Sequence, residues 1–238
     1  MASTDTKPAP VEQGPAERSR RANWPRRIWI AVLALLVLTA GSLIQGNLAL
    51  VGMSWLARST TDLEGAVEVD GVRKVYALDD RVLRGAQPGM TGFRSLAARG
   101  VTTVVDLRPG GVHKEDRELR ALGLEVVHLP ITDGRPPSPS QVRQFVAIAR
   151  ESRGLVFVHC GEGVGRAGTM SAAYRVTTGE TNSSEAVRQS LAVGVLTLEQ
   201  ITFINSLERD GAHSPPAPVA AISRYLDGPR QLFNRFIG

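Results

Sequence analysis

The chain has 238 residues, of which 42% are hydrophobic and 21% are charged, a balance typical of one globular domain with accessory segments and not of a wholly disordered protein. Its net charge of +5 comes mostly from the N-terminus, where residues 1–27 hold six Lys or Arg against three Asp or Glu. Because no basic stripe with interleaved aromatic residues follows, the composition argues against nucleic acid as a partner. The single cysteine, Cys160, excludes an intramolecular disulfide.

The N-terminal region predicts a membrane anchor. Residues 1–27 are polar and rich in Pro, Ala and Ser, which predicts a disordered basic tail. The next seventeen residues, Ile28–Ile44, carry no charge and reach the lower limit for spanning about 30 Å of hydrocarbon. Five arginines lie just before this run and the next is Arg58, so the positive-inside rule places the N-terminus in the cytosol and the rest of the chain outside. We therefore predict a single-pass signal anchor over residues 28–50, with a cleaved signal peptide and a buried core helix as alternatives.

Strand and helix patterns alternate after a predicted linker over residues 51–66. Val101–Leu107 is a β-branched run of the kind found in strands, and several helical patterns end at glycine. Such alternation predicts an α/β domain with a largely parallel central sheet over residues 67–212. Residues 213–238 are predicted as a C-terminal tail that can form an amphipathic helix. Other helices are expected at 93–99, 113–122, 138–152, 166–178, 184–192 and 198–209, and other strands within 72–83 and at 124–131 and 155–159.

The segment LVFVHCGEGVGRAGT, residues 155–169, carries the chemistry. A buried strand is expected to end beside Cys160, and a glycine-rich loop then leads to Arg166 at the start of a helix. Glycines let backbone N–H groups point inward and the helix N-terminus adds partial positive charge, so the loop predicts an anion cradle. Cys160 at its base would be favoured as a thiolate, and the fork of Arg166 can hold two phosphate oxygens. The residues of this phosphate-binding loop are Gly161, Glu162, Gly163, Val164, Gly165 and Arg166.

The segment around Cys160 resembles the signature of protein tyrosine and dual-specificity phosphatases, which is His-Cys, five loop residues with a central glycine (here Gly163), and Arg. Residues 75–88 resemble the opening strand and Arg-Gly-x-x-Pro turn of small dual-specificity-type domains, and residues 104–108 resemble their next strand. The resemblance covers roughly residues 67–210. It implies a central mixed sheet flanked by helices, hydrolysis through a phosphocysteine intermediate, and no cofactor or metal.

The resemblance also implies a general acid on a loop before the cysteine. Asp133 follows an expected strand, begins a Pro-rich loop and lies 27 residues before Cys160, which suits the compact members of the family. A turn-forming Asp-Gly pair is the alternative for this residue. Asp106 within a strand, and Glu115 and Asp116 in an expected solvated helix, fit the acid role less well.

One position departs from the family pattern. Ala167 stands where Ser or Thr is usual, whose hydroxyl helps the cysteine leave, so slow breakdown of the phosphocysteine is expected unless the nearby Thr169 substitutes. His159 is expected to support the loop by bonding the Cys160 backbone. Gln200 resembles a late glutamine that orients water in some relatives, with an ordinary surface helix residue as the alternative.

The loop composition bears on the substrate. Glu162 is acidic and no lysine lies between Cys160 and Arg166, so a multiply phosphorylated ring would be repelled. Phosphotyrosine-type protein substrates or small phosphomonoesters are therefore expected. Two alternatives stay open: a rhodanese-type sulfurtransferase, which also uses a cysteine on a loop cradle, and a membrane-tethered pseudophosphatase that binds phosphorylated ligands without turnover.

Overall fold

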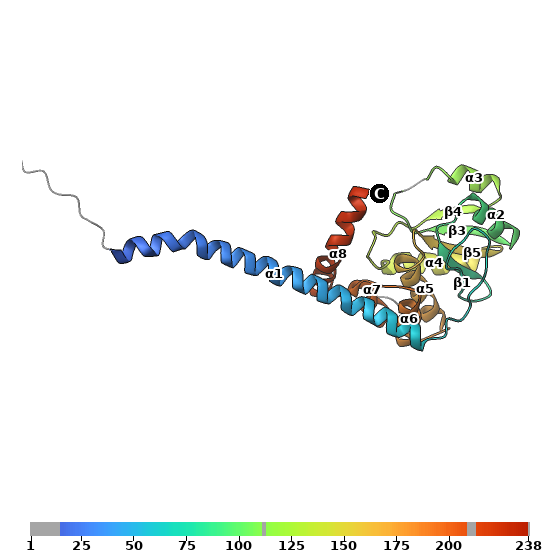
Figure 1. The fold of residues 1–238 in the computed structure, drawn as a ribbon. Helices are drawn as coiled ribbons and strands as arrows, with labels where there is room; N and C mark the ends of the chain where they lie inside the picture. Colours follow the sequence, from blue (N-terminus) through green and yellow to red (C-terminus); the bar gives the residue numbers. More distant parts are fainter. Residues whose placement is uncertain (1–14, 111–112, 209–212, 238) are drawn as a thin grey trace, which may run out of the picture. The chain divides into compact units, whose positions relative to one another are not determined.

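The computed structural model of the chain describes residues 15–110, 113–208 and 213–237 (Figure 1). The chain divides into two compact units, Met1–Gln45 and Gly46–Gly238. Helix α1 (Pro15–Thr60) contributes its first residues to the first unit and its last residues to the second. The second unit contains the sheet and all the other described helices.

Helix α1 is longer than the apolar run that predicts it. Residues 1–14 of the predicted disordered tail lie outside the described residues, but residues 15–27 are helical, which corrects the prediction for that part of the tail. Pro15 suits a first helical turn, which needs no amide donor, and the Ala, Glu and Arg residues after it are strong helix formers. Residues 26–60 are long and apolar enough to cross a membrane, and most of their large apolar side chains are exposed. A signal sequence near an N-terminus meets the same criteria.

The predicted linker over residues 51–66 is wrong for its first ten residues, which are the last turns of α1. These turns pack within the second unit. Ser54 is buried and donates a hydrogen bond from Oγ to the Leu191 carbonyl at 2.8 Å, and Arg58 donates from Nε to the Ala192 carbonyl at 3.2 Å. The apolar pattern of this stretch therefore serves packing against the globular unit, so the connection to the first strands begins only after Thr60.

Five strands form the central sheet: β1 (Tyr76–Ala77), β2 (Val82–Ala86), β3 (Val101–Asp106), β4 (Glu125–His128) and β5 (Leu155–Cys160). Their order is β1-β2-β5-β3-β4. The β1–β2 pair is antiparallel and the other three neighbouring pairs are parallel. This confirms the predicted α/β class with a mostly parallel mixed sheet.

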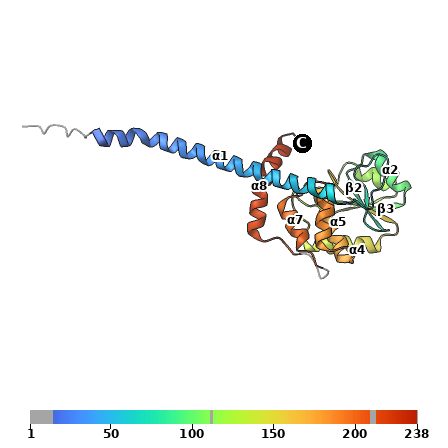
Figure 2. The same ribbon diagram turned by 60° about the horizontal axis from the view of Figure 1, so that its bottom comes forward.

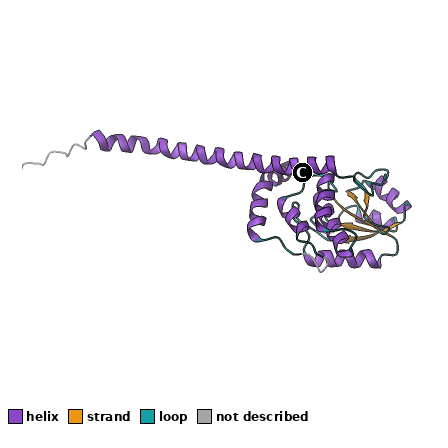
Figure 3. Cartoon of the chain, turned by 90° about the horizontal axis from the view of Figure 1, so that it is seen from below, coloured by secondary structure: helices purple, strands orange, loops and turns teal. Residues whose placement is uncertain are grey.

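Within the described residues, seven helices follow α1: α2 (Met90–Ala98), α3 (Asp116–Ala121), α4 (Pro139–Glu151), α5 (Gly165–Thr178), α6 (Ser183–Val193), α7 (Leu198–Asn205) and α8 (Ala217–Ile237). Figure 3 shows helices on both sides of the strands. In β5, Val156 and Val158 join the core formed with α4, α5, α6 and α7, whereas Phe157 joins a second core formed with α2 and α3. Both faces of the central strand are buried, which explains why β5 reads as a continuous apolar run.

Capping residues lie at helix ends near the predicted positions. Ser138 Oγ accepts a hydrogen bond from the Gln141 amide at 3.2 Å, and Gln141 Oε1 accepts one from the Ser138 amide at 2.9 Å, so the predicted capping box opens α4. Gly100 and Gly123 follow α2 and α3 with φ values of +94° and +79°, a conformation that other residues rarely adopt. Helices α3 and α7 are shorter than predicted.

The C-terminal tail forms helix α8, as its amphipathic pattern allows. Ser223 and Asp227 are buried on one face, while Ile222 and Leu232 are exposed. Figure 2 shows α8 beside α7, and the Ser223 hydroxyl accepts a hydrogen bond from the Glu199 amide at 3.0 Å. Helix α8 is therefore attached to α7.

Candidate active site

Cys160 lies where β5 ends and the glycine-rich loop begins. It is 2% exposed and pairs in register with Ala86 of β2. Helix α5 begins at Gly165, so a short loop joins strand and helix as predicted. The Gln87 amide donates a hydrogen bond to the Gly161 carbonyl at 3.0 Å, which ties the loop to the end of β2. The N-terminal amides of α5 are thereby held close to the cysteine, in the arrangement that favours an anion.

Two glycines of the loop are required by close contacts. Gly163 has a φ of +71°, and a Cβ at this position would lie 2.5 Å from the Ala86 amide nitrogen. A Cβ on Gly165 would lie 3.0 Å from Gln200 Nε2. The loop backbone is therefore packed against both β2 and α7, which fixes its shape before any ligand binds.

Arg166 and Asp133, the residues predicted as phosphate clamp and general acid, are in contact with each other. Arg166 Nη2 lies 3.2 Å from Asp133 Oδ1, and the side chain of Arg166 is only 11% exposed. A Cβ on Gly161 would lie 3.8 Å from Arg166 Nη2, so the guanidinium lies beside the loop. Arg166 Nη1 also donates to the Ile131 carbonyl at 3.5 Å. A phosphate that binds Arg166 must therefore compete with the Asp133 carboxylate.

Helix α8 contributes a second cation to Asp133. Arg230 Nη2 lies 3.3 Å from Asp133 Oδ2, and the Asp133 side chain is 34% exposed. The neighbouring Gly134 has a φ of +76°, and its carbonyl accepts a hydrogen bond from Thr197 Oγ1 at 2.7 Å. The loop that carries Asp133 is thus held by α7 and α8. Sequence reasoning missed Arg230, because a basic residue on a terminal amphipathic helix gives no local sign of its partner.

His159 forms the predicted hydrogen bond behind the loop. Its Nδ1 donates to the Cys160 carbonyl at 3.2 Å, and its ring stacks on Phe157 with centroids 5.8 Å apart. Burial lowers the pKa of His159 to about 4, although the nearby Asp106 acts in the opposite direction. The imidazole is therefore neutral at physiological pH, which fits a supporting role.

Thr169 does not replace the hydroxyl that Ala167 lacks. Both residues are fully buried on α5, and Thr169 Oγ1 donates a hydrogen bond to the Gly165 carbonyl at 2.7 Å. This bond keeps the Thr169 hydroxyl within its own helix. The departure from the family pattern at Ala167 is thus not compensated by the neighbour considered from the sequence.

Gln200 is buried next to the loop, so the surface alternative for this residue is wrong. It is 1% exposed, and its Oε1 accepts a hydrogen bond from the Thr197 amide at 3.1 Å in the capping box of α7. Its Nε2 donates to the Arg135 carbonyl at 3.3 Å and lies against Gly165. Gln200 therefore links the cysteine loop to the loop that carries Asp133.

The three rival acids are committed to other partners. Asp106 is 2% exposed and accepts hydrogen bonds from Arg108, whose Nη2 lies 2.6 Å from Asp106 Oδ2 and 2.6 Å from Glu115 Oε1. Burial, the largest single influence, would raise the pKa of Asp106, but the hydrogen bonds from Arg108 and the charges of His159 and Arg108 together outweigh it, and the net shift is downward. Asp116 bonds His128 Nε2 at 2.8 Å and is buried, so its prediction as a solvated helix residue is wrong.

A cluster near these acids has the residue types of a metal site, but its charge does not suit a metal cation. Asp106, His113 and His128 bring potential ligand atoms within 4.8 Å of one another. Asp106 Oδ2 already accepts a hydrogen bond from Arg108 at 2.6 Å, so a cation here would face a guanidinium. The carboxylate is neutralised within the protein, and the cluster fits a metal ion poorly.

A cleft of about 630 Å³ lies beside the loop, and its lining includes the loop residues Glu162 and Val164 but not Cys160 or Arg166. Lys74 Nζ donates to the Glu162 carbonyl at 3.3 Å and lies 3.9 Å from its carboxylate. The positive charge of Lys74 weakens the argument that Glu162 repels multiply phosphorylated substrates. The two residues are far apart in the sequence, so the sequence alone did not reveal this contact. Further cations and apolar residues share the cleft: Arg58, Arg230, Leu50, Val51, Val164 and Leu226.

Comparison with known proteins gives a consistent result for this region. Residues 67–206 match the family described as "DSP-PTPase phosphatase fused to NAD+ Kinase". Over 100 residues the chain is 34% identical to the probable NAD kinase 2, chloroplastic, of Oryza sativa subsp. japonica, covering 39% of this chain and 10% of the relative. Over 82 residues it is 39% identical to the dual specificity protein phosphatase CDC14A of Mus musculus, covering 34% and 13%. The chain thus spans only about a tenth of the length of these curated relatives.

One solved structure shows the same fold. The core catalytic domain of the PP-IP phosphatase SIW14 from S. cerevisiae superposes with a TM-score of 0.52 at 13% identity, covering 60% of this chain and 90% of that domain. Tk-PTP in its active form is 25% identical with a TM-score of 0.47, covering 56% and 92%.

Proposed function

Because the chain belongs to the family of DSP-PTPase phosphatases described as fused to NAD+ kinase, and is therefore a cysteine-type phosphatase, we propose that it hydrolyses phosphate monoesters through a phosphocysteine on Cys160. The observation that carries the proposal is the contact of Arg166 with Asp133 at 3.2 Å beside the Cys160 loop. This contact supports the proposed roles of Arg166 as phosphate clamp and of Asp133 as proton donor in the reaction at Cys160. The catalytic domain is proposed to span residues 67–212.

In the first step, the Cys160 thiolate attacks phosphorus and the bond to the leaving oxygen breaks. Asp133 donates its proton to that oxygen, so an alcohol leaves. The loop amides and Arg166 hold the three remaining phosphate oxygens as negative charge shifts onto them. The fixed contacts of Gly163 and Gly165 keep the amides in place, so little reorganisation is needed during the step.

In the second step, water attacks the phosphocysteine and Asp133 accepts its proton. The sulfur–phosphorus bond breaks, releasing inorganic phosphate and the Cys160 thiolate. Gln200 lies between the two loops and is proposed to help orient this water. The two steps balance without a cofactor or metal, because the Cys160 thiolate and the protonated Asp133 are both regenerated.

The proposed substrates are phosphotyrosine-type proteins or small phosphomonoesters. The cleft beside the loop has room for an aryl group and offers apolar walls together with cations. The full-length chain, purified in detergent, should hydrolyse a phosphotyrosine peptide faster than a phosphoserine peptide or phosphoinositide vesicles. A preference for phosphoinositides would overturn the substrate proposal, and cyanide-dependent sulfur transfer would indicate a sulfurtransferase instead.

Asp133→Asn should lower kcat about 10²–10⁴-fold for phenyl phosphate, whose leaving group needs protonation. The loss should be much smaller for p-nitrophenyl phosphate, whose leaving group departs as an anion. Stopped-assay kinetics with both esters measures the difference. Glu115→Gln serves as the control, because Glu115 bonds Arg108 and not the loop. An equal loss for both esters would remove Asp133 from the acid role.

Ala167→Ser should raise the steady-state rate. Breakdown of the phosphocysteine requires thiolate departure, and with Ala167 the usual hydroxyl donor is missing, so the second step should limit turnover. A pre-steady-state burst of alcohol, stoichiometric with enzyme, is expected in the wild type and should shrink in the variant. One hydrogen bond to a charged group contributes about 1.5–3 kcal/mol, which converts to about 10- to 150-fold at 1.36 kcal/mol per decade.

Thr169→Val provides the control for this effect, because the Thr169 hydroxyl is bonded to the Gly165 carbonyl. Its burst should match that of the wild type. If neither Ala167→Ser nor the wild type shows a burst and their rates agree, the first step limits and the missing hydroxyl has no kinetic consequence. If no enzyme form turns over although phosphopeptides bind, the chain is a phospho-ligand-binding pseudophosphatase.

We further propose that α1 anchors the chain in a membrane through residues 28–50, with the N-terminus in the cytosol and the phosphatase domain outside. The apolar composition and the five preceding arginines support this. A reporter that is active only outside the cytosol, fused after Gly238, should be active in cells. An N-terminal tag should remain on the full-length chain. Loss of the tag would indicate a cleaved signal peptide, and an inactive reporter would reverse the topology.

A further inference from the structure

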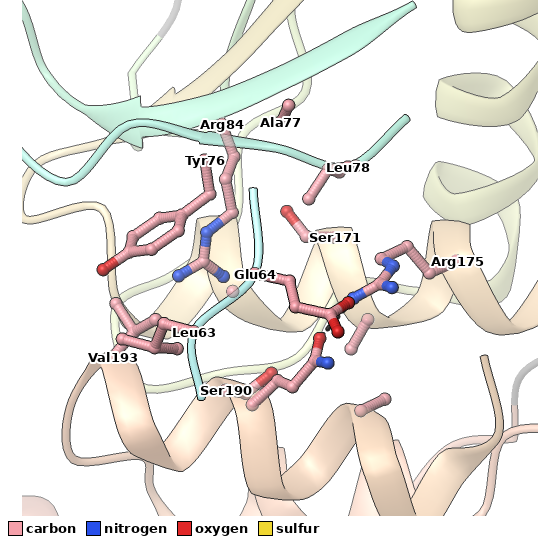
Figure 4. Close-up of a pocket in the computed structure, with 14 residues that line it drawn as sticks. Leu63, Glu64, Tyr76, Ala77, Leu78, Arg84, Ser171, Arg175, Ser190 and Val193 are labelled. Carbon is pink, nitrogen blue, oxygen red and sulfur yellow. Dashed lines mark hydrogen bonds between the residues drawn. The ribbon is translucent and has the colours of Figure 1, made fainter. Parts of the chain in front are cut away.

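A small cavity lies between β1, β2, α5 and α6, and we call it the Arg84 pocket (Figure 4). Its volume is about 40 Å³, enough for a few water molecules or one small ion. Arg84 enters from β2, and Arg175 lines it from α5. None of the residues of the cysteine loop lines it. Other lining residues are Glu64, Tyr76, Gly168, Ser171, Gln189 and Ser190.

Arg84 is the unusual member of this pocket. Its side chain is 4% exposed, and its Nε and Nη2 atoms are buried without a hydrogen-bond partner. The guanidinium lies over the Tyr76 ring at 5.1 Å from the centroid. That cation–π contact offsets part of the charge but leaves the N–H donors unsatisfied. A buried guanidinium usually has an acceptor within reach, so the missing acceptor calls for an explanation.

Arg175 adds a second positive charge. Its Nη1 donates to Gln189 Oε1, while its Nε is buried without a partner. Among the described residues, no carboxylate lies within the 4.0 Å that defines an ion pair with either guanidinium, although Glu64 also lines the pocket. Burial lowers the pKa of Arg84 to about 10, with Arg175 acting in the same direction, so the Arg84 guanidinium still carries its charge at neutral pH. Two unpaired guanidinium groups in one cavity attract an anion.

We propose that the Arg84 pocket is a second, non-catalytic site that binds one small inorganic oxyanion of the phosphate or sulfate type, held by Arg84 and Arg175. The oxyanion supplies the acceptors that the buried N–H groups lack. The cavity volume excludes a nucleotide or a sugar phosphate as a fully enclosed ligand.

Strand β2 and helix α5, which line the pocket, also flank the catalytic loop. Arg84 precedes Gly85 and Ala86, which pair in register with His159 and Cys160. A Cβ on Gly168, in the first turns of α5, would lie 3.2 Å from Arg84 Nη1. An anion held by Arg84 therefore stabilises the strand and the helix that frame the cysteine loop.

Sulfate binding to the full-length chain in detergent tests the site. The experiment uses the Arg166→Ala variant, in which the loop no longer binds an oxyanion. Calorimetry is run at constant ionic strength, with chloride replacing sulfate in the control, so that general salt effects cancel. One sulfate should still bind, and the midpoint of thermal unfolding should rise with sulfate concentration. Adding Arg84→Gln should weaken binding about 10-fold or more, because charge-assisted hydrogen bonds are lost.

Gln189→Glu is the matched second variant, because it keeps the side-chain shape and supplies Arg175 with a carboxylate. It should weaken sulfate binding about 10-fold while keeping or raising the unfolding midpoint without sulfate. Loss of all sulfate binding in Arg166→Ala alone would overturn the proposal. Unchanged sulfate affinity in Gln189→Glu would also overturn the proposal. So would binding of glycerol phosphate to a variant that does not bind sulfate.

Discussion

Cys160→Ser is expected to abolish turnover of a phosphotyrosine peptide, lowering kcat roughly 10⁴-fold or more, which is the scale on which removal of a nucleophile acts. Serine keeps the approximate shape of the side chain, so the replacement removes the sulfur without changing the volume of the site much. A hydroxyl in place of the thiol is a far weaker nucleophile, because it stays protonated. Stopped-flow or radiolabelled release of phosphate measures the loss.

The same variant should still bind the phosphopeptide, because the cradle consists of backbone amides and Arg166. Calorimetric affinity for the peptide should therefore match that of the wild type, and Cys160→Ser combined with Arg166→Ala should lose it. Hydrolysis near the wild-type rate would exclude Cys160 as the nucleophile. Loss of binding together with loss of thermal stability would instead show that the serine disrupts the loop.

The sequence predicts the local parts of this site better than its long-range parts. A β-branched strand, a cysteine, three glycines and an arginine at a helix start are local features, and the structure arranges them as expected around Cys160. The chain also places Asp133 against Arg166, although only the family resemblance suggested that pairing. The alternation of strand and helix patterns predicts a mostly parallel sheet but not the order of its strands. That order depends on where each connecting helix crosses the sheet.

Two kinds of contact could not be predicted, because the same sequence pattern occurs in segments with different surroundings. The apolar run of α1 looks the same whether it faces lipid or a protein core, so the packing of Ser54 and Arg58 against the globular unit was hidden. Likewise, Arg230 and Lys74 reach the site from positions 97 and 88 residues away from their partners. Charge patterns in a single sequence do not encode such partners.

Arg166→Lys should lower kcat/KM about 10²–10³-fold, the cost typical of removing one oxyanion donor from a preorganised site. A guanidinium can donate two parallel hydrogen bonds to equatorial phosphate oxygens, whereas an ammonium acts as a point charge. The structure sharpens this expectation, because Arg166 uses its two terminal nitrogens in different directions, toward Asp133 and toward the Ile131 carbonyl. A lysine cannot make both contacts at once.

Arg230→Lys is the matched control, because Arg230 contacts the same carboxylate from the outside of the site. Its side chain is 51% exposed, and exposed ion pairs contribute little. This variant should change kcat/KM only slightly. Because both variants keep the positive charge, equal losses would mean that guanidinium geometry around Asp133 matters in general and that Arg166 has no special role as phosphate clamp. A small loss for Arg166→Lys alone would show that the loop amides, fixed by Gly163 and Gly165, hold the transferring phosphoryl group without the arginine.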